Sequence, residues 1–194
     1  MSSEFLIWRY KTVRGACVPD RLTGVKKKFQ LHEGVPLRAG FPSDAAFHMN
    51  PDFPDDLLLA DNVRNGALAV LVSERLHRFL ADRQLEHLEY LPVKVMDHKG
   101  RVASDTHVIV HPVGLVDCID LAQSVYEPSE FVEGDIDRFD KLVVDASRVP
   151  ADRQVFKLRG YGELTLVRRG LADALSQQGY SGLDWLEIDA FSGR

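Results

Sequence analysis

The stretch VLVSERLHRFLADRQLEHLEYLPV, residues 70–93, has the pattern of a strand, a helix and a second strand. Residues 68–72 are short, apolar and rich in Val and Leu, which favours a strand. Ser73 is typical of a helix N-cap, because its hydroxyl can accept from the free amides of the first turn. The apolar residues that follow recur at i, i+3 and i+4, which predicts a helix of about ten residues with one buried face: Leu76, Phe79 and Leu80. Residues 88–96 then predict a strand.

The same apolar skeleton returns 95 positions later as TLVRRGLADALSQQGYSGLDWLEI, residues 165–188. The second copy predicts a strand, a helix over about 169–178 ended by Gly179, and a strand over 183–188. The matched pairs include Leu71 with Leu166, Leu76 with Leu171, Leu80 with Leu175, and Tyr90 with Trp185. The polar residues between them differ. A unit that repeats its buried face but not its surface is a building block, so function is to be sought on the surface.

The totals describe a chain that can bury a core. It has 194 residues, 45% of them hydrophobic, with ten Phe and two Trp, which suits one domain or two intimate halves. The opening MSSEFLIWRY lacks the long apolar region of a signal peptide. No segment approaches the roughly 20 apolar residues that cross a membrane. The sequence therefore predicts a soluble, cytoplasmic protein without a membrane partner.

The two cysteines are too few and too far apart for a disulfide framework. Cys118 lies in an apolar run and is interpreted as a small core residue, whereas Cys17 is interpreted as a loop thiol. The sequence is also compatible with a single disulfide bridge between Cys17 and Cys118.

The net charge of −5 is unevenly distributed. Residues 1–38 carry eight basic and three acidic residues, a balance of +5, whereas residues 39–194 carry 16 and 26, a balance of −10. The acidic majority repels phosphate, which argues against nucleic acid as the main ligand. The lysine cluster at 25–29 is interpreted as a solvated loop or strand edge.

The rest of the chain predicts a mixed architecture. Residues 5–10 favour a strand, and residues 1–65 form an irregular arm that Pro and Gly interrupt. Five apolar residues of the arm are expected to be buried: Phe29, Leu31, Phe41, Phe47 and Phe53. Further strands are expected at 106–113, 115–121, 141–145 and 152–158. These elements predict a single α+β domain over 1–194, with a largely antiparallel sheet and the two related strand–helix–strand units packed in one core within 66–194.

No motif nominates catalysis, a metal or a cofactor. His107 and His111 are four apart, but the intervening residues alternate as in a strand, where the rings would stand about 13 Å apart at ~3.3 Å per residue. That separation is too wide for one zinc ion, so both are interpreted as exposed strand histidines. Walker, G-x-S-x-G and H-E-x-x-H motifs are missing from the sequence.

Residues 127–140, EPSEFVEGDIDRFD, are strongly acidic. Three interpretations stay open: a solvated loop, a contact surface for a basic partner, and a metal or catalytic site. An EF-hand is disfavoured because DIDRFD, residues 135–140, lacks the turn glycine and the final bidentate Glu of that loop.

The order of several segments resembles a family of bacterial immunity proteins, family eleven among those of polymorphic toxin systems. The resemblance spans about residues 57–190. It is strongest in the S-E-R-x-x-x-x-L helix from Ser73, in V-D-x-x-D-x-x-x-S-x-Y at 116–126, and in G-x-x-G-L at 179–183. The chain departs from the family at TLVRRGL, where a serine–glutamate start is more usual, which weakens the cap of the second helix.

The resemblance implies an antitoxin without chemistry of its own, whose partner is a secreted toxin encoded nearby, such as a nuclease or another enzyme with a basic cleft. An acidic segment could occlude such a cleft in place of substrate. Tyr126 and Phe131 are candidate aromatic anchors, although ordinary core packing is the slightly favoured explanation of both. The acidic contacts expected are Glu127, Glu130, Glu133, Asp135, Asp137 and Asp140.

Two other classes compete with this interpretation. The first is an enzyme whose site combines Asp117 and Asp120 with His107 or His111. It predicts a pocket in which these side chains converge. The second is a general protein-binding adaptor, which would bind several unrelated partners with modest affinity.

Overall fold

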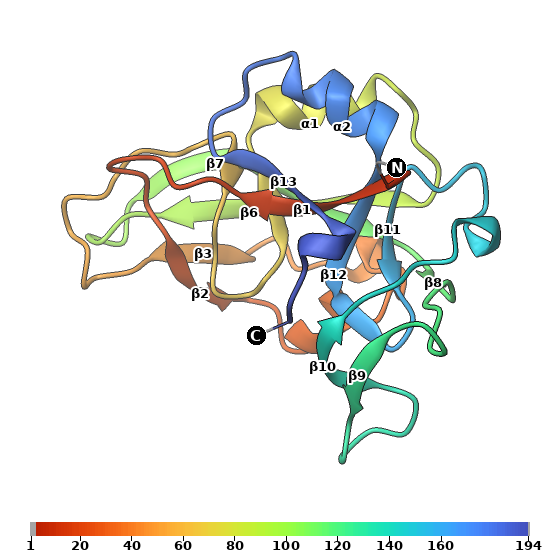
Figure 1. The fold of residues 1–194 in the computed structure, drawn as a ribbon. Coiled ribbons are helices and arrows are strands. Elements are labelled where there is room, and N and C mark those ends of the chain that lie inside the picture. Colours follow the sequence, from red (N-terminus) through yellow and green to blue (C-terminus); the bar gives the residue numbers. More distant parts are fainter. Residues whose placement is uncertain (1–2, 194) are drawn as a thin grey trace.

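The computed structural model describes residues 3–193 and, within them, combines two α-helices with three β-sheets (Figure 1). The α+β class predicted from the sequence is confirmed. Most neighbouring strands are antiparallel, but β3 pairs parallel with β6 and β8 parallel with β11, so the two larger sheets are mixed.

The first sheet has five strands in the order β13-β1-β12-β11-β8. Its strands are β1 (Phe5–Tyr10), β8 (Leu115–Val116), β11 (Val155–Leu158), β12 (Tyr161–Arg168) and β13 (Leu183–Glu187). The strand predicted at 5–10 is confirmed. The β-region expected over 115–121 is reduced to the two residues of β8, with one further bridge between Ile119 and Val144.

The second sheet has six strands in the order β2-β3-β6-β7-β5-β4. Its strands are β2 (Pro19–Thr23), β3 (Ala46–Met49), β4 (Asn62–Val63), β5 (Val70–Val72), β6 (Leu88–Met96) and β7 (Val102–Pro112). The arm thus supplies three strands to this sheet. Short 3-10 helices complete the chain: η1 (Lys28–Leu31), η2 (Arg38–Gly40), η3 (Ala146–Arg148) and η4 (Ile188–Ala190).

Each of the two similar sequence stretches folds in the order strand, helix, strand. In the first, β5 leads into α1 (Glu74–Ala81) and then β6; in the second, β12 leads into α2 (Arg169–Ser176) and then β13. The flanking strands never pair directly, because β7 lies between β5 and β6, and β1 lies between β12 and β13. The inserted strand is antiparallel to both neighbours in each case, so the flanking strands run parallel.

The two helices pack over one hydrophobic cluster, to which α1 contributes Leu76 and Leu80 and α2 contributes Leu171 and Leu175. Ser73 caps α1 as predicted, since its Oγ accepts from the amide of Leu76. Helix α2 has no side-chain cap at Arg168. Neither helix of residues 3–193 is long and apolar enough to cross a membrane.

Asp61 ties the two stretches together. Its Oδ1 accepts from the hydroxyl of Ser73 at 2.7 Å, and its Oδ2 accepts from the amide of Ser181, beyond α2, at 2.9 Å. Although burial raises the pKa of Asp61, the hydrogen bonds from Ser73 and Ser181 bring it below its ordinary value. The start of α1 and the end of the α2 segment are therefore held by one carboxylate.

The hydrophobic interior divides into three clusters, one of them formed by the six-stranded sheet and the arm. Leu31 and Phe47 are buried in that cluster and Phe41 packs partly against it, as expected. The expectation was wrong for Phe29 and Phe53, which are 58% and 55% exposed; Phe29 lies on the outer side of the short helix η1, and Phe53 lies in a loop.

Both cysteines are free and buried. Cys17 lies in a loop, as predicted, but its side chain packs with the arm, whereas Cys118 packs in a different cluster beside the five-stranded sheet. No bridge joins them. Burial raises the pKa of Cys17 to about 11 and that of Cys118 to about 12, so both are inert thiols near neutral pH.

Candidate functional site

The acidic segment forms a hairpin rather than a loop. Strands β9 (Val125–Pro128) and β10 (Ile136–Lys141) pair antiparallel, and Figure 1 shows this acidic hairpin, residues 125–141, extending away from the rest of the fold. The prediction of a loop over 127–140 and a strand over 141–145 was wrong. Ile136 and Phe139 are both buried although they are three apart, and the register shifts on β10 make this possible, which hides the strand from a period-two reading.

The base of the hairpin is anchored by packed aromatic rings. Phe139 is fully buried, and its ring centroid lies 5.2 Å from that of Tyr161 in an edge-on arrangement. The ring of Tyr126 also packs against Phe139, with the two centroids 6.1 Å apart. Tyr126 is therefore half-buried and belongs largely to the core, in line with the core-packing alternative. These contacts fix the direction in which the hairpin projects.

The tip presents an exposed aromatic residue on a hydrogen-bonded turn. Phe131 is 91% exposed, so core packing does not account for it. The hydroxyl of Ser129 accepts from the amides of Phe131 and Val132, and the amide of Ser129 donates to the backbone carbonyl of Asp135 at 2.9 Å. The turn passes close to the core at Gly134, whose carbonyl oxygen would lie 2.7 Å from a Cβ at Gly160. The exposed ring is thus carried by an ordered backbone.

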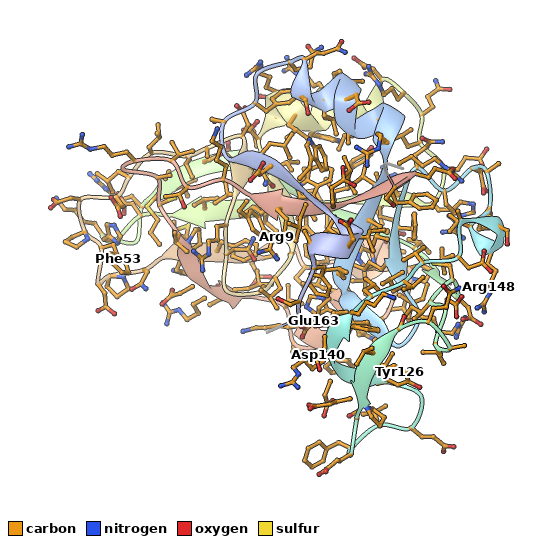
Figure 2. All side chains as sticks on the ribbon, in the orientation of Figure 1. Arg9, Phe53, Tyr126, Asp140, Arg148 and Glu163 are labelled. Atoms are coloured by element: carbon orange, nitrogen blue, oxygen red, sulfur yellow. The ribbon has the colours of Figure 1, made fainter. Side chains whose placement is uncertain are left out.

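Charge is distributed unevenly along the hairpin. At its base Arg138 pairs with Glu127 at 2.8 Å and with Asp140 at 3.4 Å. Figure 2 shows Tyr126 and Asp140 at this end. The acidic residues nearer the tip form no ion pair within residues 3–193: Glu130, Glu133, Asp135 and Asp137. The base is therefore partly neutralised, while the tip keeps its negative charge.

The structure brings all the expected contact residues onto this one hairpin. Tyr126 and Glu127 lie on β9, Asp137 and Asp140 lie on β10, and the others lie in the turn: Glu130, Phe131, Glu133 and Asp135. All are exposed except the half-buried Tyr126.

The prediction of exposed histidines on the returning strand was wrong. His107 and His111 lie on β7, but they are only 5% and 1% exposed. The reason is the position of β7, which is a central strand between β5 and β6. His111 Nε2 donates to the carbonyl of Val35 at 2.8 Å, and His107 Nδ1 lies 2.7 Å from Ser104 Oγ. Burial lowers the pKa of both rings, which keeps them neutral.

The side chains of the alternative enzyme site do not come together. Asp117 and Asp120 line a shallow pocket with Arg148, and no histidine of residues 3–193 lines that pocket. Asp117 pairs with Arg148 at 2.8 Å, and Asp120 Oδ1 accepts from the amide of Ala122. Both carboxylates are thus occupied by local contacts.

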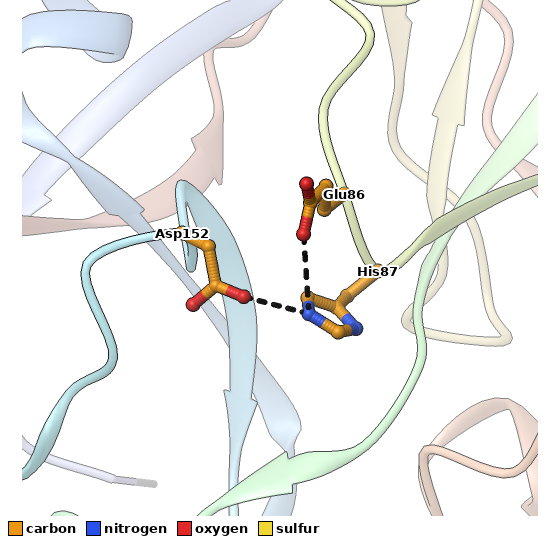
Figure 3. A group of neighbouring side chains, drawn as sticks. All are labelled: Glu86, His87 and Asp152. Atoms are coloured by element: carbon orange, nitrogen blue, oxygen red, sulfur yellow. Dashed lines mark hydrogen bonds and ion pairs between the residues drawn. The ribbon is translucent and has the colours of Figure 1, made fainter.

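One cluster could not be foreseen from the sequence. Figure 3 shows His87 between Glu86 and Asp152, with Nε2 2.8 Å from Asp152 and 3.9 Å from Glu86. One imidazole and two carboxylates can ligate a divalent metal, but here they are exposed and pair with one another. The hydrogen bond from His87 lowers the pKa of Asp152. Because His87 and Asp152 are 65 positions apart, no local pattern indicates the contact.

A projecting, ordered hairpin with an aromatic tip and unneutralised carboxylates has the features of a protein-contact surface rather than of a catalytic pocket. The chain belongs to the immunity protein family Imm11, whose model matches residues 17–190. The match confirms the resemblance and extends it into the arm, which begins to match at residue 17 rather than 57. No curated protein sequence matches the chain.

Proposed function

We propose that this protein neutralises one cognate toxin in the cytoplasm by binding it and blocking its active or substrate-binding site with the acidic hairpin. The toxin is a protein encoded nearby, and the protein itself catalyses nothing and needs no cofactor. Family membership supports toxin immunity as the general role. The hairpin supports the choice of contact surface.

The observation that carries the proposal is the exposure of Phe131 at the tip. A buried Phe side chain contributes roughly 1.5–3 kcal/mol relative to an exposed one, so the free protein forgoes this stabilisation at Phe131. A partner with an apolar pocket would recover it, as aromatic anchors do at the centres of interfaces. The surrounding carboxylates favour a pocket inside a basic cleft, the kind that a nuclease or another enzyme of anionic substrates possesses.

The scaffold behind the hairpin supports a single domain with two related halves. Both strand–helix–strand stretches split their parallel strands around an inserted antiparallel strand, and both place their helices over one cluster. The polar residues of the two stretches differ, as the sequence repeat already showed. We infer that the halves preserve a common frame while the surface adapts to one partner.

Growth of a host that expresses the C-terminal domain of the adjacent open reading frame tests the proposal. Co-expression of this protein should restore growth, and the two proteins should co-purify as a tight complex. Rescue without a complex would favour the enzyme alternative, in which the toxin's product or substrate is altered. Modest binding to several unrelated proteins without rescue would favour the adaptor.

A further inference from the structure

The five-stranded sheet splits between β1 and β12. These strands pair only from Phe5 to Ile7, opposite Leu166 to Arg168. Beyond that point β1 stays with β13 as far as Tyr10, whereas β12 stays with β11 back to Tyr161. A cleft of about 700 Å³ opens where the two strands diverge, with residues of β4 and of the chain's last turn completing its wall. Small-molecule sites commonly occupy about 300–1,000 Å³.

Four basic and two acidic side chains line this cleft. Its four cations are Arg9, Lys11, Arg14 and Arg64. None of them forms an ion pair within residues 3–193, although seven arginines elsewhere in that range pair with carboxylates. Burial raises the pKa of Tyr10 to about 12, while Arg9 and Arg64 both act to lower it, which places their charges around the same phenol. The structure thus gathers unneutralised positive charge in a protein that is acidic overall.

The lining also contains acidic and aromatic side chains. The acidic residues are Asp56 and Glu163, and the rings include those of Tyr161 and Phe191. Arg9 and Glu163 are labelled in Figure 2. Neither Asp56 nor Glu163 makes an ion pair with any residue from 3 to 193, so the cleft keeps two free negative charges beside its four positive ones. A uniformly acidic peptide laid along the cleft would meet Glu163 and be repelled.

We propose that this cleft binds a small organic molecule that carries a phosphate or diphosphate group, with the phosphates against Arg9 and Arg64 and the organic body towards Tyr161. Guanidinium groups match phosphate oxygens with two parallel hydrogen bonds. Several cations suit a ligand with a multiply charged phosphate group better than a ligand with a single carboxylate. The aromatic rings suit a planar body, and Glu163 can accept a hydrogen bond from its hydroxyl or amino groups. This proposal stands independently of the toxin.

Isothermal titration of the purified full-length protein with ADP tests the assignment, because ADP combines a diphosphate with a planar, hydroxylated body. We expect saturable binding that weakens in about 0.5 M NaCl. The double variant Arg9→Ala/Arg64→Ala should lose at least about tenfold in affinity. Arg159→Ala is the matched control, since Arg159 is exposed, unpaired within the described residues and outside the cleft, and it should bind as the wild type does.

Glu163→Gln separates the body contact from the phosphate contact. It should change affinity for ADP but leave that for pyrophosphate equal or higher, because a repelling charge is removed. If the double variant fails to fold, Lys11→Ala/Arg14→Ala in the adjoining loop replaces it and should also weaken ADP binding. Absence of ADP binding at ~5 mM, binding that ignores these variants, or tighter binding of hexaglutamate than of ADP would overturn the proposal.

Discussion

The ammonium nitrogen of Lys157 lies 3.4 Å from Nδ1 of His32, where the five-stranded sheet meets the arm. Lys157 also donates to the carbonyl of Gly162 at 2.7 Å, and His32 Nε2 lies 3.1 Å from the carbonyl of Ala67. His32 therefore donates through Nε2 and accepts from Lys157 through Nδ1, as a neutral ring. Burial lowers the pKa of Lys157 to about 8 and that of His32 to about 4.

The buried lysine makes stability depend on pH above neutrality. Because the pKa of Lys157 is about 8 in the folded protein and 10.5 ordinarily, the unfolded chain binds more protons in that window. The stability that neutral Lys157 allows is fully present above pH 10.5, and it is lost as pH falls from 10.5 through 8. We expect the free energy of unfolding in urea to gain up to about 3 kcal/mol from this residue as pH rises across the window. Lys157→Met should remove that gain, and equal slopes for the two proteins would contradict it.

The acidic tip should govern the rate of association with the toxin. Reversing Glu130, Glu133, Asp135 and Asp137 to lysine removes the attraction to a basic cleft, so the association rate constant should fall by roughly tenfold or more at low salt. The dissociation rate should change less. Stopped-flow or biolayer measurements at two ionic strengths check this. Asp52→Lys/Asp55→Lys, on an exposed loop away from the hairpin, is the control. An unchanged association rate would show that the acidic tip does not contribute to association with the toxin.

The aromatic tip should govern the lifetime of the complex instead. Phe131→Ala should weaken toxin binding by about 2–4 kcal/mol, mainly through faster dissociation, if Phe131 fills a pocket on the partner. Its thermal stability should stay that of the wild type, because the ring is exposed in the free protein. Phe53→Ala removes another exposed ring, remote from the hairpin in Figure 2, and should leave binding unaffected. Equal effects of the two substitutions would argue against a specific anchor.

Features written in short, local patterns could be predicted from the sequence. The strands at 5–10 and 88–96 and the cap at Ser73 follow from β-forming runs and from a hydroxyl placed before an apolar stripe. The acidic segment was also recognisable, since charge needs no knowledge of the fold. In each case the information lies within about ten residues of the chain.

Features that depend on strand order could not be predicted. The exposure of His107 was misjudged because only the sheet order shows that β7 has a neighbour on each side. Strand β10 was missed because its bulges break the alternation that marks a strand. The cleft between β1 and β12 joins segments from both ends of the chain, so the shared position of Arg9, Arg64 and Glu163 has no local signature.

The contact between Lys157 and His32 also depends on a glycine that admits the arm. A Cβ at Gly162 would overlap the carbonyl oxygen of His32, which is backbone and cannot rotate away. Gly162→Ala should therefore push η1 and His32 outwards and destabilise the fold by about 1–3 kcal/mol. Gly170 offers a matched control, because a Cβ there would meet nothing within 4 Å and the residue lies in α2.

Gly170→Ala should stabilise the protein by roughly 0.5–1 kcal/mol, since alanine restricts the unfolded chain and favours a helix. Urea unfolding of both variants and the wild type shows whether the free energy of unfolding falls for Gly162→Ala and rises for Gly170→Ala. In Gly162→Ala the displaced imidazole should also loosen its contact with Lys157, so the pH dependence between 8 and 10.5 should change together with stability. If the Gly162→Ala variant is as stable as the wild type, the arm tolerates displacement. The close approach of His32 to β12 then does not hold the arm in place.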